Sequence, residues 1–343
     1  MSGNWIRYAG TRARTPNFGV TMFGQILIGL AQPFVLAAPT RYSDLWFTPQ
    51  GRLSATAAAS LANPFGGALG QLISPMFVQH PSDIPDMILY IAIISSVATI
   101  PSMFIPSKPP TPVSASSNHA YVPIRLQISL LTGRTPFWLL FFPFAVYVGF
   151  FNSFSSLLTQ FQTPYGFSET QSGIAGALLI LVGLVAAAII SPIIGRSKRY
   201  ILLIKILAPV IALCYLVFIW VPASRSVAAS DIVCAVLGAA SFSLMPVALE
   251  WIAEVTWPVG PEVGSVFCWA GGQALGGIFI IVSGAMKDGI GYPPNNYRKA
   301  MIFQAVLALA AVPAALSLGI VGGKVRNRRL EVDKGIELEL NRI

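Results

Sequence analysis

The sequence predicts an all-α protein, a multi-pass bundle of about nine transmembrane helices. Hydrophobic residues make up 55% of the 343 residues and charged residues only 10%, whereas soluble proteins carry about 25% charged residues. Apolar stretches long enough to cross a bilayer also recur along the chain. So few charged side chains cannot cover soluble domains with polar surface, and soluble enzyme folds are therefore excluded.

The helices are predicted from the length of these stretches. A bilayer core takes about 20 apolar residues as a helix, and nine stretches of that length are bounded by charged residues, proline or glycine. They cover residues 17–38, 55–79, 87–105, 136–160, 173–195, 201–221, 231–256, 263–285 and 300–322. The second stretch contains Asn63, Pro64 and several glycines. It needs neighbouring helices to satisfy the backbone groups that these residues free.

Changes in composition divide the chain into five parts. The longest loop is rich in proline and serine, a composition that cannot bury a core. For the final residues, 324–343, a short surface helix and a disordered tail both remain open. The predicted parts are a polar amino-terminal segment (1–16), a partial first-half bundle of three helices (17–105), a cytosolic loop (106–135), a second-half six-helix bundle (136–322) and a cytosolic tail (323–343).

The net charge of +9 helps to orient the chain. With a cytosolic carboxy terminus, 14 Lys and Arg residues fall on the cytosolic side and 7 on the other, which agrees with the positive-inside rule. Arg7, Arg12 and Arg14 then lie on the unfavoured side. We expect a multi-pass integral membrane protein with a cytosolic carboxy terminus. The plasma membrane is the default location, and an internal organelle membrane is the alternative.

An internal repeat appears when the sequence is shifted against itself by 209 positions. Pro49 then falls on Pro258, Gly51 on Gly260 and Gly67 on Gly276. In each copy an apolar helix is followed by a short loop with an aromatic residue before proline, then by a glycine-rich helix. Parallel repeats of this kind are typical of the two halves of a transporter.

Four segments resemble a known family. They are VTMFGQ at 20–25, APTRYSDLWF at 38–47, FNSFSSLL at 151–158 and LEWIAEVTWP at 249–258. In sequence and order they resemble the feline leukaemia virus subgroup C receptor-related transporters, a branch of the major facilitator superfamily. The resemblance implies a major-facilitator-like bundle that begins near the end of the family's third helix.

The resemblance also implies a function. Members of the branch are described as transporters of heme, choline or related small organic solutes, which implies a secondary transporter or facilitator working by alternating access. The aromatic residue with which the family's first helix holds a cationic substrate has no counterpart here. The family's fifth-helix glutamine falls at Pro64, whereas its eleventh-helix glutamine is kept as Gln273. The alternative is a truncated, non-transporting membrane protein that acts as a binding partner, a receptor or an inactive relative.

Polar and aromatic side chains at bilayer depth are the candidates for binding substrate, because burying them in a membrane is costly. The predicted substrate-binding residues are Gln273, Asn152, Asn63, Tyr147 and Trp269. Three structural alternatives stay open. Gln273 and its glycines could instead hold two helices together, Asn63 could satisfy a carbonyl freed by Pro64, and the aromatic helix around Asn152 could serve packing alone.

Glu250 and Glu254 are four residues apart and so share one face of a helix near its cytosolic end. Two like charges there need cations, and the candidates are Arg41, Arg52 and the cluster of Arg196, Lys198 and Arg199. We predict a gating network of Glu250, Glu254 and Arg41, with proton coupling as the alternative.

The sequence predicts no catalytic residue, no metal site and no cofactor, because catalytic and nucleotide-binding motifs are absent. Cys214, Cys234 and Cys268 lie in apolar stretches and are predicted to be buried hydrophobic residues. His80 and His119 lie in loops and form no heme site. The expected partners are the lipid bilayer and a small-molecule solute, with no nucleic acid, and a homodimer is expected only if the chain is complete.

Overall fold

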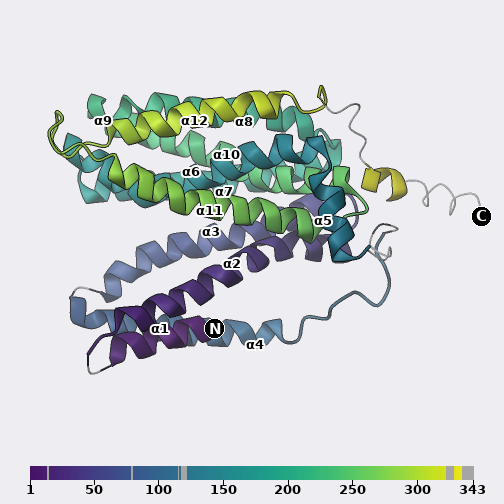
Figure 1. The fold of residues 1–343 in the computed structure, drawn as a ribbon, viewed down its shortest axis with the longest axis horizontal. Coiled ribbons are helices and arrows are strands. Elements are labelled where there is room, and N and C mark those ends of the chain that lie inside the picture. The colour runs from purple at the N-terminus through teal and green to yellow at the C-terminus, as the bar shows by residue number, and fades with distance from the viewer. Residues whose placement is uncertain (14, 79, 115, 117–121, 322–327, 334–343) are drawn as a thin grey trace, which may run out of the picture.

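The computed structural model describes residues 1–343 except 14, 79, 115, 117–121, 322–327 and 334–343. Within the described part, nine long helices confirm the predicted all-α bundle (Figure 1). They are α2 (Phe18–Trp46), α3 (Arg52–Phe77), α4 (Ile84–Ser102), α6 (Thr135–Gln162), α7 (Glu169–Ser197), α8 (Tyr200–Phe218), α10 (Val227–Thr256), α11 (Pro261–Ala285) and α12 (Arg298–Leu316).

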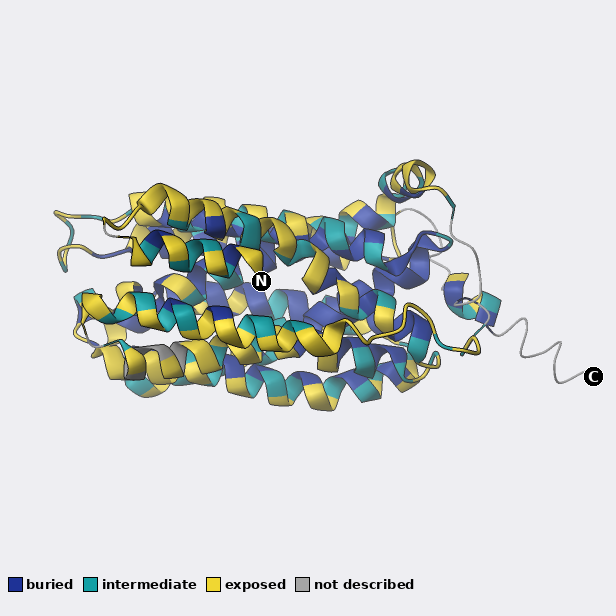
Figure 2. Cartoon of the chain, turned by 90° about the horizontal axis from the view of Figure 1, so that it is seen from below, coloured by how far each residue is buried: buried dark blue, intermediate teal, exposed yellow. Residues whose placement is uncertain are grey.

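Eight of these helices are long and apolar enough to cross a membrane, as far as the described residues show. The helix outside this set is α3, whose polar and glycine-rich middle makes it the least apolar of the predicted spans. Large apolar side chains cover the outward faces of the bundle (Figure 2), among them Leu30, Ile94 and Phe104. This surface suits contact with lipid.

The helices extend beyond several predicted ends because the sequence breakers lie inside them. The first span was expected to stop at residue 38, but α2 continues through Pro39 to Trp46. The Thr40 hydroxyl donates to the Ala37 carbonyl at 2.7 Å, and the Ser43 hydroxyl donates to the Thr40 carbonyl at 3.1 Å. Both hydroxyls are thus paired with backbone carbonyls of the same helix, so these polar groups are satisfied where α2 continues past Pro39.

The polar amino-terminal segment contains a helix that the sequence did not indicate, α1 (Ser2–Arg12). It packs on α2 and α4 with close backbone contact, since a Cβ added to Gly3 would lie 2.6 Å from the Gly24 carbonyl oxygen. Asn4 and Trp5 donate to the Ser95 and Ser96 hydroxyls of α4 at 3.0 and 2.9 Å. These contacts form a bundle of α1, α2 and α4.

The second half contains the main core of the described structure. Its six long helices are α6, α7, α8, α10, α11 and α12, and α9 (Val221–Ser224) is a single turn between α8 and α10. The closest approach is between α7 and α10, where a Cβ added to Gly238 would lie 1.8 Å from the Leu179 carbonyl oxygen. Only glycine fits there without movement of the backbone.

The two halves meet at one end of the bundle, the end where residues 328–333 form a short helical segment (Figure 1). We call this the tail end. In α3, Arg52, Leu53 and Thr56 at the tail end are fully buried, whereas Cβ atoms added to Gly66 and Gly67 would meet nothing within 4 Å. At Gly66 and Gly67, α3 therefore has no close neighbour on the side of the added Cβ atoms.

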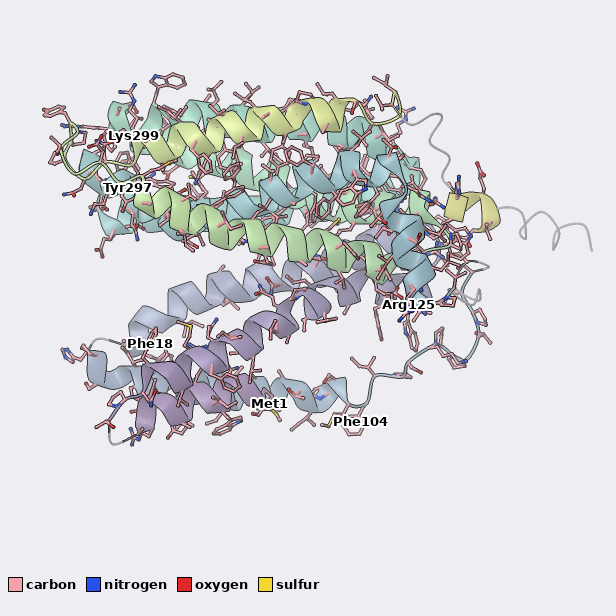
Figure 3. All side chains as sticks on the ribbon, in the orientation of Figure 1. Met1, Phe18, Phe104, Arg125, Tyr297 and Lys299 are labelled. Carbon is pink, nitrogen blue, oxygen red and sulfur yellow. The ribbon has the colours of Figure 1, made fainter. Side chains whose placement is uncertain are left out.

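The predicted loop at 106–135 also contributes to the tail end. Its last part forms α5 (Ile124–Thr132), which carries Arg125 at the tail end. Tyr297 and Lys299 lie at the other end of the bundle (Figure 3). The Gln127 amide donates to the Val122 carbonyl at 2.7 Å and accepts from the Gly260 backbone N–H at 2.8 Å. Gln127 thus ties the connection between the halves to the turn before α11.

The structure reproduces the internal repeat. Helices α2 and α10 begin at Phe18 and Val227, and α3 and α11 begin at Arg52 and Pro261. Both pairs of starts are separated by the 209 positions of the sequence repeat. Equivalent residues of the two halves therefore lie at the same height in equivalent helices.

We predict that Gly238→Ala lowers the free energy of unfolding by about 1–3 kcal/mol, because the added methyl group overpacks the contact of α10 with α7. Thermal unfolding of the detergent-solubilised protein measures the effect. Gly173→Ala on α7 is the matched control, since its Cβ would meet nothing within 4 Å, and alanine is favoured over glycine in a helix by roughly 0.5–1 kcal/mol. Equal unfolding temperatures for the two variants would contradict the close contact.

Candidate functional site

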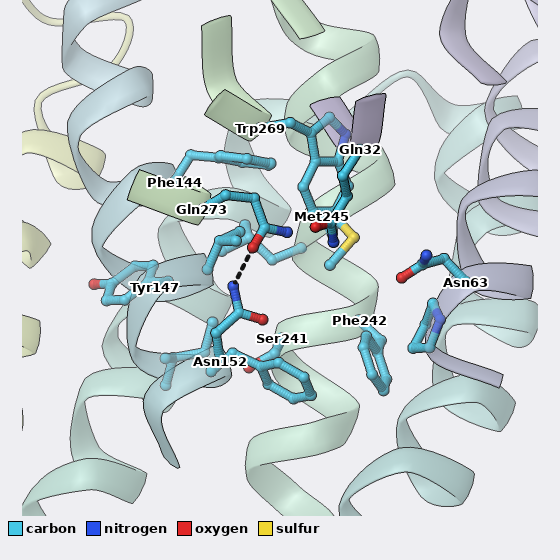
Figure 4. Close-up of a pocket in the computed structure, with 15 residues that line it drawn as sticks. Gln32, Asn63, Phe144, Tyr147, Asn152, Ser241, Phe242, Met245, Trp269 and Gln273 are labelled. Atoms are coloured by element: carbon cyan, nitrogen blue, oxygen red, sulfur yellow. Dashed lines mark hydrogen bonds between the residues drawn. The ribbon is translucent and has the colours of Figure 1, made fainter. Parts of the chain in front are cut away.

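A pocket between the two halves brings the predicted substrate-binding residues together (Figure 4). Its empty space, which includes the part open to solvent, is about 650 Å³. The pocket is lined by α2 and α3 from the first half and by α6, α8, α10 and α11 from the second. Gln273, Asn152, Asn63, Tyr147 and Trp269 all line it. The structure thus gathers residues that are up to 210 positions apart in the sequence.

Asn152 and Gln273 form a polar pair on one wall. The Asn152 amide of α6 donates to the Gln273 carbonyl of α11 at 3.0 Å. The neighbouring glycines allow this approach, because a Cβ added to Gly272 or Gly276 would lie 2.6 Å from Val148 or 3.1 Å from Asn152. Gln273 therefore joins two helices, as the structural alternative expected, and also lines the pocket. The bond leaves the Gln273 amide NH₂ and the Asn152 carbonyl to a ligand.

The two other predicted residues of the second half present rings rather than polar groups. The Tyr147 hydroxyl points away from the pocket and donates to the Ala208 and Ala308 carbonyls, each at 3.3 Å. Trp269 packs edge-on against Phe144, with ring centroids 5.8 Å apart. The Trp269 indole N–H is buried and has no hydrogen-bond acceptor among the described residues. An indole donor in this position is available to a ligand with an acceptor oxygen.

Asn63 faces this wall from α3 (Figure 4). The sequence analysis missed two polar residues that line the pocket with it, Gln32 of α2 and Ser241 of α10. A signal for both exists in the sequence, because Gln32 and Ser241 are separated by the 209 positions of the repeat, as are Pro64 and Gln273. The repeat therefore generates a pocket with matching polar positions in the two halves.

The pocket lining contains amide, hydroxyl, aromatic, thioether and aliphatic groups. Among the described residues that line it, none carries a charge. The additional rings are Phe151 and Phe242, whose centroids lie 5.0 Å apart. Phe144, Tyr147 and Phe151 of the aromatic helix line the pocket. The alternative that this helix serves packing alone stays a prediction.

The charged groups lie on the tail-end side of this pocket. Glu250 and Glu254 are buried to about 1% exposure, and both accept from Arg329 of the segment 328–333. Burial alone would lower the pKa of the Arg329 guanidinium, but Glu250, Glu254 and Asp44 more than offset it, so this pKa lies well above its usual range. Arg329 stays charged at any physiological pH.

Arg41 occupies a different place from the one predicted. It lies 3.8 Å from Asp44 and 3.9 Å from Glu262. Arg329, which also pairs with Asp44, is the guanidinium in direct contact with Glu250 and Glu254, and a gating role for Arg41 stays a prediction. Sequence analysis missed Arg329 and Asp44, because the contacts of Arg329 with Asp44 and with Glu250 join positions 285 and 79 residues apart. Arg52, a second predicted partner, lies 3.4 Å from Asp44.

The histidines and cysteines agree with the sequence analysis where the structure describes them. His80 is exposed in the connection between α3 and α4, where its backbone N–H donates to Asp83 at 2.9 Å. His119 lies outside the described residues. Cys214, Cys234 and Cys268 are buried and free.

Similarity to known proteins shows the family of this chain. The family model described as Major Facilitator Superfamily matches residues 5–281. Solute carrier family 49 member A3 of Danio rerio is 32% identical over 97% of this chain and 73% of its own length. The choline/ethanolamine transporter FLVCR1 of Felis catus is 26% identical over 94% of this chain and 61% of its own length.

A solved structure shows a similar fold. The Major Facilitator Superfamily transporter FucP, in the outward conformation, gives a TM-score of 0.65 at 16% identity and covers 91% of this chain and 79% of its own. The resemblance predicted from the four segments is confirmed by these findings. The chain therefore belongs to the Major Facilitator Superfamily, a family of solute carriers that are not enzymes, within its feline leukaemia virus subgroup C receptor-related branch.

Proposed function

We propose that this protein is a secondary transporter or facilitator that moves a small organic solute of the choline or amine type by alternating access. The observation that supports this most directly is the pocket between the halves, where Trp269, Phe144 and the Asn152–Gln273 pair converge. Sites for small molecules in transporters lie at such an interface, near the middle of the membrane. Two of the relatives are named choline/ethanolamine transporters.

The chemistry of the lining favours a small ammonium compound. Aromatic faces attract organic cations, with a contribution of about 0.5–2 kcal/mol for each well-placed ring. Amide groups and the Trp269 indole N–H can bond a hydroxyl group of the same solute. The partial first half (17–105) and the second half (136–322) would each supply one wall.

Heme fits this lining less well. Heme carries carboxylates, and among the described lining residues there is no cation to receive them. Met245 is a candidate iron ligand in the pocket, whereas the Tyr147 hydroxyl is bonded to two backbone carbonyls. An amine-like cargo is thus preferred over heme.

Alternating access is supported by the unequal ends of the bundle. At the tail end, buried charges bridge the halves, whereas Cβ atoms added to Gly66 and Gly67 in α3 would meet nothing within 4 Å. We further propose that the tail end faces the cytosol, which agrees with the distribution of Lys and Arg. The plasma membrane is the proposed location.

Uptake into liposomes that contain the purified chain tests this function. We expect saturable uptake of radiolabelled choline or ethanolamine that exceeds uptake into empty liposomes, and no such uptake of heme. If neither amine is taken up or bound, the proposed cargo class is wrong. Binding without uptake would instead favour the non-transporting alternative.

We predict that Trp269→Ala raises the KM for the transported amine about tenfold, because it removes a ring and an indole donor that are together worth roughly 1.4 kcal/mol. Initial rates of uptake at varied concentrations measure this. The matched control is Phe142→Ala, which removes a ring that is 46% exposed on the outside of α6. An unchanged KM in Trp269→Ala would place the cargo elsewhere.

We predict that Glu254→Gln changes the transport rate without changing the shape of its pH profile. If Glu254 only pairs with Arg329 to close the tail end, the variant weakens this ion pair and changes the rate. It removes no group that carries a proton during transport, so the pH profile keeps its shape. Uptake at pH 5.5–8 measures both quantities. Glu169→Gln, at an exposed position in the first turn of α7, is the control. A proton-driven uptake that disappears in Glu254→Gln would show proton coupling instead.

A further inference from the structure

The helical segment at 328–333 lies inside the tail end rather than on its surface. Arg329 is 1% exposed and Asp333 is 9% exposed, whereas the neighbouring Arg328 is exposed. Burying a charged side chain is costly unless it is paired. The burial of Arg329 and Asp333 therefore requires oppositely charged partners within the tail end.

Arg329 contacts carboxylates from both halves of the bundle. Its guanidinium lies 3.3 Å from Asp44 of α2 and 3.1 Å from Glu254 of α10, and it also pairs with Glu250. The backbone N–H of Leu330 donates to the second Glu254 oxygen at 3.0 Å. One residue of the tail thus joins the first half to the second.

Asp333 extends the same bridge to α3 and to the connection between the halves. It accepts from Arg52 at 2.9 Å and from the Ser116 backbone N–H at 2.9 Å. Arg52 in turn donates to the Ser116 hydroxyl at 2.7 Å and lies 3.4 Å from Asp44. The tail thus supplies Arg329 to the carboxylates of Asp44, Glu250 and Glu254, and Asp333 to the guanidinium of Arg52.

Without the tail segment, Glu250 and Glu254 would lose Arg329, the guanidinium that contacts both of them directly. Lys198 and Arg52 also act electrostatically on Glu250, but among the described residues neither forms an ion pair with it, and Arg52 lies against Asp44 instead. Three carboxylates in one buried group repel one another unless cations or water enter. Either of these would separate α10 from α2 and α3.

This position controls access to the pocket. Arg52 precedes Asn63 on α3 by roughly 16 Å at 1.5 Å per residue, and Glu250 follows the pocket residue Met245 by little more than one helical turn. The segment therefore lies directly on the tail-end side of the pocket. Opening toward the tail end requires Arg329 and Asp333 to leave their partners.

We propose that residues 328–333 act as a latch, in which Arg329 and Asp333 hold the tail end of the pocket closed until the segment withdraws. The latch is a part of the chain outside the predicted membrane spans, so it can be released without unfolding a membrane helix. The effect of the latch on uptake rests on the proposed function, whereas its effect on the distance between the two halves is independent of that function.

Distances between spin labels at the tail end test the latch without added solute. Labels at Thr48, in the loop between α2 and α3, and at Ser129, on α5, occupy exposed positions on the two sides. Replacing the native cysteines by alanine provides the background. We expect the full chain to give mainly a short distance, and Arg329→Ala to enlarge the long-distance population several-fold.

Arg328→Ala is the matched control, because it removes the adjacent, exposed guanidinium, and we expect it to keep the short distance. Arg329→Lys keeps the charge, and we expect its long-distance population to lie between those of Arg328→Ala and Arg329→Ala. If Arg329→Ala fails to fold by size-exclusion chromatography, Asp333→Asn replaces it, with the same expected direction. If Arg329→Ala, or Asp333→Asn in its place, gives the same distance distribution as Arg328→Ala, the latch proposal is wrong. This result would leave the proposed cargo untouched, because no cargo is present.

Discussion

The two halves of the bundle meet at one end, where charges are paired that could not be buried separately. Each buried carboxylate of this end is paired with a guanidinium from another element: Asp44 with Arg52, and Glu250 and Glu254 with Arg329. Isolated, each of these ions would be strongly unfavourable at low dielectric. Together they fix α2, α3 and α10 at a common point, from which the helices diverge around the pocket (Figure 1).

The internal repeat explains why the diverging helices produce a site with two similar walls. Helices α2 and α10 begin at equivalent positions, and so do α3 and α11. Gln32 and its equivalent Ser241 therefore both line the pocket, and so do Pro64 and its equivalent Gln273. The walls have also diverged chemically. The amide lies on α11, and the proline on α3 leaves the adjacent Asn63 as the polar group of that wall.

Much of this arrangement could be predicted from the sequence, because membrane helices are encoded by local composition. The nine long helices, the six of the second half and the polar residues of the spans all follow from apolar length and from the cost of polar groups in lipid. The convergence of Gln273, Asn152 and Trp269 required in addition the repeat and the family resemblance. Their part in binding cargo stays a prediction.

What could not be predicted depends on contacts distant in sequence or on short elements. Arg329 lies in a tail whose alternation of charged and aliphatic residues suits a surface helix as well as a disordered segment. Nothing local distinguishes its guanidinium from that of Arg328, yet one is buried and the other exposed. Helix α1 was missed for a related reason: its 11 residues are polar, and they are helical because Gly3 and Gly10 pack against α2.

The separation of charge from the pocket is consistent with a site that must release what it binds. The described lining residues carry no charge, and the carboxylates of the tail-end group are paired with two guanidinium groups. Aromatic rings attract an organic cation by about 0.5–2 kcal/mol each. A carboxylate in direct contact would hold the cation far more tightly. Passage through a membrane requires binding that is favourable but weak enough to reverse. An aromatic and amide pocket without charged lining residues meets that requirement for the small organic cation that we propose as cargo.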